Sequence, residues 1–530
     1  MDKEAGKSVA VKKNIGDFFQ LGAYVGYLVL TYEFLLISQV SNLIYMSFGG
    51  VPAKPVGCGN KLFDSPNITS DEACSSLKTL RSANSSCEVV LDAAFKSVNY
   101  EFGYYCDTAM TVKTSTSFQM IGIIFGAVVF GQLSDTIGRR KTLLFGTVGL
   151  IVSGFASTFA VGLWSFTAAR FFVMFFTGGK HSVSYVFMTE NLPARHRLWI
   201  LTLVTYSPNY LVVTGIAYLT GEWRLFSRVA AAITIVPLIM LLFVKESPRW
   251  LLQKGKIDEA RDAVLGIGSW DRSNTEQRRA DLDEIIEKER NRLRQAAENN
   301  EPPRRYYTYH LFSSRALATY SIFFAYSLMI TSIISYGIVF NTERLSGSPY
   351  LNLIIIGSLR YVINICAAII DIKFKWAGRR LLHSVSMASI SACLGFVFVT
   401  NVLGIEMDSV VRYLTLSASA ICTEIYILDA VQPSELFPTA IRNIGIGFIQ
   451  TFNRIGNTLA PQIFVTAKLW TPLPYLVMCC LSTGEVLAYL GLIPETKGKQ
   501  MVETMPGENR KPVNDSITKG DVEEKEPLKK

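Results

Sequence analysis

A series of long apolar blocks constrains this chain more than any other feature. A helix that crosses a bilayer needs about 20 apolar residues, because it rises about 1.5 Å per residue through about 30 Å of hydrocarbon. The 530 residues contain about twelve blocks of that length. They are residues 18–44, 114–134, 142–162, 164–189, 198–219, 225–244, 317–340, 350–371, 381–402, 410–431, 443–466 and 473–493.

These blocks predict an all-α membrane protein. The chain is 49% hydrophobic and only 18% charged, whereas a soluble chain of this length usually divides into domains joined by polar linkers. A membrane β-barrel would show short segments of alternating polarity, and these blocks are long and continuous.

Basic residues between the blocks predict which helix ends face the cytoplasm. The net charge of +9 is spread over short loops and does not form a nucleic-acid-binding patch. All of these loops fall on one side if the N-terminus is cytoplasmic, as the positive-inside rule requires. Residues 1–17 have no apolar core of the kind found in a cleaved signal peptide, so we expect the first span to remain. The basic residues are Lys12, Lys13, Arg139 to Lys141, Arg195, Arg197, Arg379, Arg380 and Arg442.

Residues 45–113 have the features of a large extracellular loop. Glycosylation sequons begin at Asn67 and Asn84. An even number of cysteines in an oxidising compartment predicts two disulfides, with three possible pairings. Free thiols and unused sequons are the alternative. Four of the nine cysteines lie in this loop: Cys58, Cys74, Cys87 and Cys106.

The remaining segments complete the predicted organisation. Leu282, Ile285, Ile286 and Leu293 give the second long loop a weak helical periodicity, which favours a solvated helical linker over a partner-binding site. The polar tail is expected to be disordered. We therefore predict a cytoplasmic N-terminus (1–17), a six-helix half (18–244), a cytoplasmic linker (245–312), a second half (313–497) and a cytoplasmic tail (498–530).

An internal repeat divides the chain into these halves. The triplet Gly138-Arg139-Arg140 follows the second span, and Gly378-Arg379-Arg380 follows the eighth. The pattern Glu-x-x-Pro-x-x-x-Arg ends the fourth span at 190–197 and the tenth at 435–442. Each half also closes on a Pro/Glu element, at 246–248 and 494–496. Three matches in register argue for duplication. Two parallel repeats predict a substrate site at the membrane midplane between the halves.

The repeated residues suit a gate between the halves. Asp135 at a membrane face can hold a basic side chain or a helix N-terminus. Simple anchoring by the arginines is the alternative, but it explains neither the glycines nor the acid. The predicted gating residues are Gly131, Asp135, Gly138, Arg139, Arg140, Glu190, Arg197, Gly378, Arg379, Arg380, Glu435 and Arg442.

The same segments resemble a known family. Residues 131–140 look like the signature loop of the major facilitator superfamily. The element Glu246-Ser247-Pro248-Arg249 resembles that of the organic ion (cation, anion, carnitine) transporters, solute carrier family 22. The resemblance runs from about residue 14 to 505 and implies the major facilitator fold, with twelve helices in two parallel repeats. The matching segments also include 101–106, 434–438 and 494–498.

Ionisable residues deep in a span are costly and mark functional sites. By helix rise, those near the midplane are Glu33, Lys180, Arg360, Glu424 and Arg454. The resemblance implies that spans 1, 4, 7 and 10 line the central cavity, with Glu33, Lys180 and Glu424 facing it. Tyr336, in span 7, is then expected to line the wall of the same cavity. Mutual pairing, of Glu424 with Arg454 or Glu33 with Lys180, is the alternative.

Arg454 bears most directly on substrate charge. Its glycine-rich surroundings resemble the anion and carnitine branches, whereas the cation branch places an acid there. Three bases and two acids suit an anionic or zwitterionic organic substrate. An organic cation carrier, a sugar-type carrier and a non-transporting receptor are the alternatives.

The sequence does not predict an enzyme. It contains neither an ATP-binding P-loop nor a zinc-protease motif, and we predict no catalytic residue, cofactor or metal. The expected partners are a small organic ion and the lipid bilayer of the plasma membrane. Whether another ion is co-transported or exchanged is open.

Overall fold

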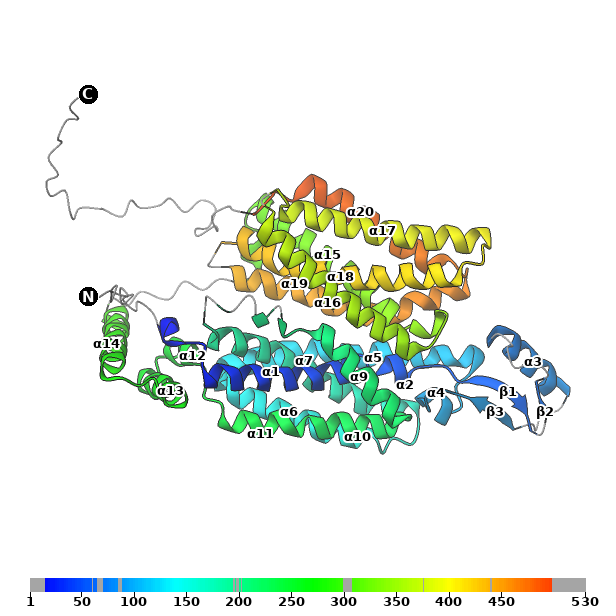
Figure 1. Cartoon of the computed structure of the whole chain (residues 1–530), viewed down its shortest axis with the longest axis horizontal. Coiled ribbons are helices and arrows are strands. Elements are labelled where there is room, and N and C mark those ends of the chain that lie inside the picture. Colours follow the sequence, from blue (N-terminus) through cyan, green and yellow to red (C-terminus); the bar gives the residue numbers. More distant parts are fainter. Residues whose placement is uncertain are drawn as a thin grey trace, which may run out of the picture.

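The computed structural model describes residues 15–59, 61–63, 70–83, 88–193, 196, 200–201, 203–298, 307–374, 376–438 and 441–497. Within them, two sets of six spans lie side by side (Figure 1). The N-terminal set is α1 (Ala23–Leu43), α5 (Met110–Ile137), α6 (Arg139–Ser157), α7 (Leu163–Asn191), α9 (Tyr206–Thr220) and the pair α10 (Trp223–Ile233) and α11 (Ile235–Phe243). The C-terminal set is α15 (Arg315–Val339), α16 (Pro349–Lys373), α17 (Arg379–Leu403), α18 (Asp408–Leu436), α19 (Arg442–Ile463) and α20 (Leu473–Leu492).

The spans differ in how strongly their composition marks them. Eight helical segments of the described chain are long and apolar enough to cross a membrane on that basis alone. The other four spans are α6, α7, α9 and α19. Helix α6 begins with basic residues, α7 and α19 carry ionisable residues, and α9 is described over only 15 residues. The predicted all-α fold of twelve spans is confirmed.

The sixth span is broken, for a reason that the sequence contains. Pro237 lies in the first turns of α11 and has no backbone N–H to donate to residue 233. The helix breaks just before it, at Thr234, and α11 restarts at Ile235.

The segment between α1 and α5 folds at one end of the bundle, which we name the loop end. Strand β1 (Lys54–Cys58) pairs antiparallel with β2 (Lys61–Leu62) and with β3 (Val89–Asp92), in the order β2-β1-β3. Short helices α2 (Met46–Gly49), α4 (Val98–Glu101) and η2 (Cys106–Ala109) connect this sheet to the bundle.

A disulfide fastens the loop. Cys74 on α3 (Ser70–Ala83) is bonded to Cys106, and Cys58 is also disulfide-bonded. Cys87 and both sequon asparagines, Asn67 and Asn84, lie outside the described residues. The sequons therefore stay predictions from sequence.

The linker between the halves folds at the opposite end, which we name the linker end (Figure 1). It forms α12 (Pro248–Gln253), α13 (Ile257–Trp270) and α14 (Glu276–Glu298). The periodic residues Leu282 and Ile286 are buried in a small core with Phe18 of η1 (Ile15–Phe18) and Val264 of α13. Leu282 and Ile286 are therefore covered by other parts of this chain, whereas Leu293 is exposed.

The two halves touch on the loop-end side. A shared core there joins Tyr45 and Phe48 of the first half to Phe340 and Leu353 of the second. Every hydrogen bond or ion pair that we find between described residues of the two halves lies between the middle of the spans and the loop end. The structure is thus closed at the loop end.

Candidate functional site

Arg360 joins the halves at mid-span. It is 7% exposed on α16, and its guanidinium donates 2.9 Å to the hydroxyl of Tyr210 on α9. It also donates to the hydroxyls of Ser335 on α15, at 2.6 Å, and Ser419 on α18, at 3.1 Å. No carboxylate of the described chain pairs with it. Its positive charge is held by hydroxyls and a ring at the boundary between the halves.

Arg454 and Arg360 both act on Tyr336, but Arg454 has no hydroxyl partners like those of Arg360 among the described residues. Its side chain is half-buried on α19, and among the described residues it makes neither an ion pair nor a side-chain hydrogen bond. Its charge acts on Tyr336 of α15 and, across the boundary, on His181 of α7 and Tyr206 of α9. The hydroxyl of Tyr206 is hydrogen-bonded to His181 at 2.8 Å. Within the described residues, the Arg454 guanidinium is therefore unpaired and lies close enough to rings of both halves for its charge to act on them.

Lys180 is buried inside the first half. Its ammonium group donates to the backbone carbonyl of Leu35 at 3.1 Å and to the hydroxyl of Ser38 at 2.9 Å, both on α1. Glu33, also on α1, is half-buried beside Asn209 of α9. The two do not form an ion pair. Lys180 adds positive charge next to His181 without reaching the boundary.

Glu424 lies apart from the arginines. It is 5% exposed on α18, and the charged groups that act on it are Asp371 of α16 and His383 of α17. It forms no ion pair with Arg454 in the described structure. Of the predicted midplane groups, Arg360 and Arg454 therefore lie at the boundary, Lys180 and Glu33 belong to the first half, and Glu424 belongs to a different cluster.

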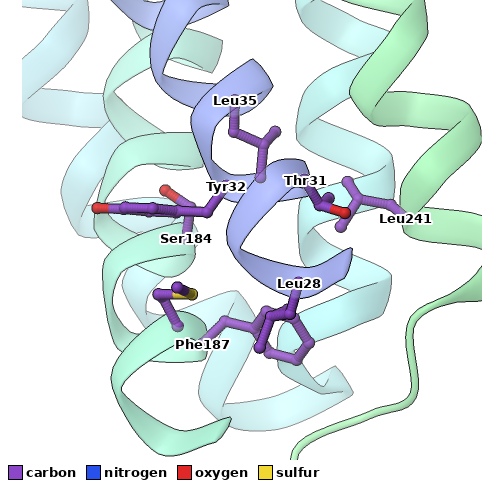
Figure 2. A pocket seen from close by; sticks show the side chains of 8 residues that line it. Leu28, Thr31, Tyr32, Leu35, Ser184, Phe187 and Leu241 are labelled. Atoms are coloured by element: carbon purple, nitrogen blue, oxygen red, sulfur yellow. The ribbon is translucent and has the colours of Figure 1, made fainter. Parts of the chain in front are cut away.

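An apolar pocket inside the first half is a separate feature. Its lining comes from α1, α7 and α11, and includes Leu28, Tyr32 and Phe187 (Figure 2). The polar side chains that line it are hydroxyl-bearing, from Thr31, Tyr32 and Ser184. This pocket offers no charge for an organic ion and does not lie between the halves.

Glu246 organises the linker end of the first half. Its carboxylate accepts the backbone N–H groups of Arg139 and Arg140 at 3.0 Å, which satisfies the first N–H groups of α6. Gly138 precedes them with φ of 111°, and a Cβ built there would lie 2.6 Å from the carboxylate. Ser247 caps α12, and Pro248 occupies its first turn. Arg249 lies over the ring of Phe19.

The side chain of Arg139 links three helices. It pairs with Asp135 of α5 at 2.5 Å and with Glu190 of α7 at 3.3 Å. Arg140 donates to the carbonyls of Leu241 and Leu242 at the end of α11. The structure thus brings the first-half gating residues together, except for Arg197, which lies outside the described residues, and Gly131, whose Cβ position is open.

The second half repeats this arrangement. Glu495 accepts the backbone N–H groups of Arg379 and Arg380 at 3.1 Å, and a Cβ on Gly378 would collide with its carboxylate. Arg379 pairs with Glu435. The aspartate of the second half has a different partner from Asp135. Asp371 pairs with Lys497 at 3.1 Å, whereas Asp135 pairs with an arginine. Arg442 opens α19 and donates to the carbonyl of Phe437.

The four backbone hydrogen bonds on Glu495 have an electrostatic consequence. Burial favours the neutral acid, but the N–H groups of Lys497, Arg380, Arg379 and Thr496 outweigh it, and the pKa of Glu495 is lowered. The carboxylate is held ionised, as a helix cap requires.

Four residues that make contacts at or near the boundary between the halves were not predicted from sequence. Lys113 of α5 and Glu343 of η4 (Thr342–Arg344) form an ion pair between the halves at the loop end, 2.7 Å long. Tyr210 accepts a hydrogen bond from Arg360, and His181 is hydrogen-bonded to Tyr206. Lys113 stands at a span end, where a charge is ordinary, so the sequence carried no signal of its partner across the boundary.

Comparisons with known proteins agree with this architecture. A family model described as sugar (and other) transporter matches residues 23–506. The organic cation transporter protein of Drosophila melanogaster is 28% identical over 417 residues, which cover 77% of this chain and 73% of that protein. Solute carrier family 22 member 16 of Homo sapiens is 26% identical over 418 residues, 76% of this chain and 68% of that protein.

Solved structures share the fold. The inward-open xylose transporter XylE from E. coli is 16% identical, with a TM-score of 0.62, and the match covers 90% of this chain and 98% of that one. A D-xylose-proton symporter is 17% identical with a TM-score of 0.60, over 90% and 100% of the two chains. The family match spans both halves and includes the repeated charged elements at the linker end. The chain therefore belongs to the sugar (and other) transporter family of the major facilitator superfamily, as a multi-pass membrane transporter similar to solute carrier family 22, and is not an enzyme.

Proposed function

We propose that this transporter carries small organic anions or zwitterions by alternating access, with the substrate carboxylate held at Arg454. The observation that carries the proposal is the free guanidinium of Arg454 among rings from both halves. An unpaired charge deep in a span is expensive, so a ligand of opposite charge stabilises it. Arginine binds a carboxylate through two parallel hydrogen bonds, which fixes orientation as well as charge.

The charges near the boundary support an anion over a cation. Arg360 and Arg454 are the predicted midplane groups at the boundary, and both are basic, whereas Glu33 is half-buried within the first half beside Asn209 and Glu424 belongs to a different cluster. Aromatic rings from Tyr206 and Tyr336 suit the apolar body of an organic ion. A zwitterion would place its carboxylate at Arg454 and its cationic group toward Glu33.

Alternating access fits the contacts between the halves. The contacts between described residues of the two halves lie at the loop end and at mid-span, so in this proposal the site opens toward the linker end. With the linker end in the cytoplasm, as the basic loops predict, this is an inward-facing state of a plasma-membrane carrier. Rocking of the two halves would then open the same site to the outside.

An organic cation carrier is the second candidate, because relatives are named organic cation transporters. In that case Glu33 would bind the cationic group. A sugar-type carrier is supported by fold similarity alone, and a non-transporting receptor would bind without moving its ligand.

An uptake panel in transfected cells separates these candidates. The probes are p-aminohippurate as an anion, L-carnitine as a zwitterion, tetraethylammonium as a cation and D-xylose as a neutral sugar, each at two membrane potentials. We expect saturable uptake of p-aminohippurate or L-carnitine that unlabelled substrate inside the cell accelerates. Uptake confined to tetraethylammonium or xylose would overturn the charge assignment, and binding without countertransport would indicate a receptor.

A further inference from the structure

A second group of ionisable side chains is buried inside the C-terminal half, away from the proposed substrate site. His383 of α17 lies between two carboxylates, with its Nε2 2.8 Å from Glu485 of α20 and its Nδ1 3.5 Å from Asp429 of α18. His383 and Glu485 are fully buried, and Asp429 is 2% exposed. Glu424 precedes Asp429 by five residues on α18, and the charge of the same histidine acts on it.

The surrounding side chains hold this cluster in place without neutralising it. The imidazole stacks on the ring of Tyr489 at 3.9 Å, and the hydroxyl of Ser327 on α15 donates to Asp429 at 2.7 Å. The other titratable groups that face the cluster are Tyr326 of α15, near Glu485, and Asp371 of α16, near Glu424. In the described structure no lysine or arginine pairs with Glu424, Asp429 or Glu485.

Charge balance requires at least one bound proton here. Three ionised carboxylates and one imidazolium would leave a net charge of minus two in a dry interior. Unbalanced buried charge costs so much that such groups take up protons instead. One oxygen atom each of Glu424, Asp429 and Glu485 is buried without a hydrogen-bond partner, so each has an atom free to carry that proton. Within the described residues no cluster of His, Cys, Asp or Glu could hold a metal ion.

The cluster also has a neighbour near the solvent and a connection to the substrate site. Asp371, whose charge acts on Glu424, lies at the linker end of α16 with its side chain 38% exposed and paired with Lys497. Helix α15 carries both Ser327, which holds Asp429, and Ser335, which holds Arg360. Helix α18 carries Asp429 and also Ser419, another hydroxyl partner of Arg360. A change of protonation can therefore move the two helices that line the substrate site.

We propose that His383, Glu424, Asp429 and Glu485 form a proton-binding site, and that this carrier couples movement of its organic ion to movement of a proton. The proton is taken up by the cluster in one conformation and released in the other, and no covalent bond other than that to the proton changes. The coupling rests on the proposed carrier function, whereas the proton site does not.

The proton site is tested without any substrate. The full chain in lipid nanodiscs is stepped in pH while infrared difference spectra record the C=O stretch of protonated carboxylic acids. We expect a buried carboxylic acid signal in the wild type that shifts or weakens in Glu485→Gln, which removes one of the three carboxylates, and in His383→Gln. His310→Gln, a histidine outside the spans, is the matched control and should leave the signal unchanged. Identical spectra for the wild type and Glu485→Gln would overturn the site, and Asp429→Asn provides a second variant if His383→Gln does not fold.

The coupling is tested in proteoliposomes with p-aminohippurate, or with L-carnitine if that probe is the one carried. The membrane potential is held at zero, and only a pH gradient is imposed. We expect the wild type and His310→Gln to accumulate the probe above equilibrium. Glu485→Gln should carry it only to equilibrium. Gradient-independent transport by the wild type would overturn the coupling, whereas failure to carry either probe at equal pH would count against the proposed function, with the infrared result deciding the proton site.

Discussion

Lys113 on α5 and Glu343 in η4 form an ion pair across the two halves, with 2.7 Å between the ammonium nitrogen and the carboxylate oxygen. The side chains are 6% and 10% exposed, and Lys113 also donates to the carbonyl of Phe340. The pair therefore belongs to the closed loop end. Removing one partner of a buried pair leaves an uncompensated charge, at a cost of about 3–5 kcal/mol.

We predict that Lys113→Met shifts the protein toward a state open at the loop end. Ser117 lies nearby on α5 and receives a hydrogen bond from Gln462, so a Ser117→Cys thiol should react faster with a membrane-impermeant maleimide added outside. The double variant Lys113→Met/Glu343→Gln removes both charges and should label at an intermediate rate. Equal labelling in all backgrounds would mean that the pair does not hold the loop end closed.

Gly138 and Gly131 provide a matched pair of glycine substitutions. A Cβ on Gly138 would collide with the Glu246 carboxylate and would require φ of 111°, whereas a Cβ on Gly131 meets nothing within 4 Å. Backbone strain of this kind costs about 1–3 kcal/mol. We expect Gly138→Ala to lower the apparent melting temperature of the purified protein by several degrees, and Gly131→Ala to leave it unchanged. Equal melting temperatures would contradict the capping role of Glu246.

Asp135 is predicted to affect turnover more than stability. Its side chain is 67% exposed, and its buried partner Arg139 also pairs with Glu190, so Arg139 keeps a carboxylate when Asp135 loses its charge. Asp135→Asn should therefore reach the cell surface and melt normally while transport slows. Asp283→Asn in the linker, which breaks the exposed pair with Arg261, is the control. Normal turnover in Asp135→Asn would reduce this residue to a marker of topology.

The sequence predicted how far along its helix each ionisable residue lies, but not which neighbouring helix its side chain faces. Helix rise alone placed Arg360 and Arg454 at mid-span, and the duplication predicted that Arg139 and Arg379 would occupy equivalent positions. Which neighbour a buried residue faces depends on helix rotation, and an apolar span shows little periodicity from which to read it. Glu424 illustrates this, because at the expected depth it faces His383 and Asp371 instead of Arg454.

Residues that act through partners far away in the sequence were the hardest to predict. Lys113 and Glu343 are 230 positions apart, and each resembles an ordinary charge at a span end. The small sheet of the loop end also went unpredicted, since strands as short as β2 carry no usable pattern of alternation.

The central claim is that Arg454 binds the substrate carboxylate, and charge substitution at this position tests it most directly. Uptake of p-aminohippurate, L-carnitine and tetraethylammonium is measured in Arg454→Lys and Arg454→Asp, with surface expression quantified. Arg315→Asp, which makes the same charge change at the exposed start of α15, is the control.

Losing a charge-assisted hydrogen bond costs about 1.5–3 kcal/mol, or roughly 10–100-fold in affinity. We predict that Arg454→Lys raises the half-saturation concentration of the anionic or zwitterionic probe by about tenfold, and that Arg454→Asp abolishes its uptake. Two results would contradict the claim that Arg454 binds the substrate carboxylate. One is unchanged uptake in Arg454→Asp, and the other is recovery of wild-type selectivity in the Arg454→Glu/Glu424→Arg exchange.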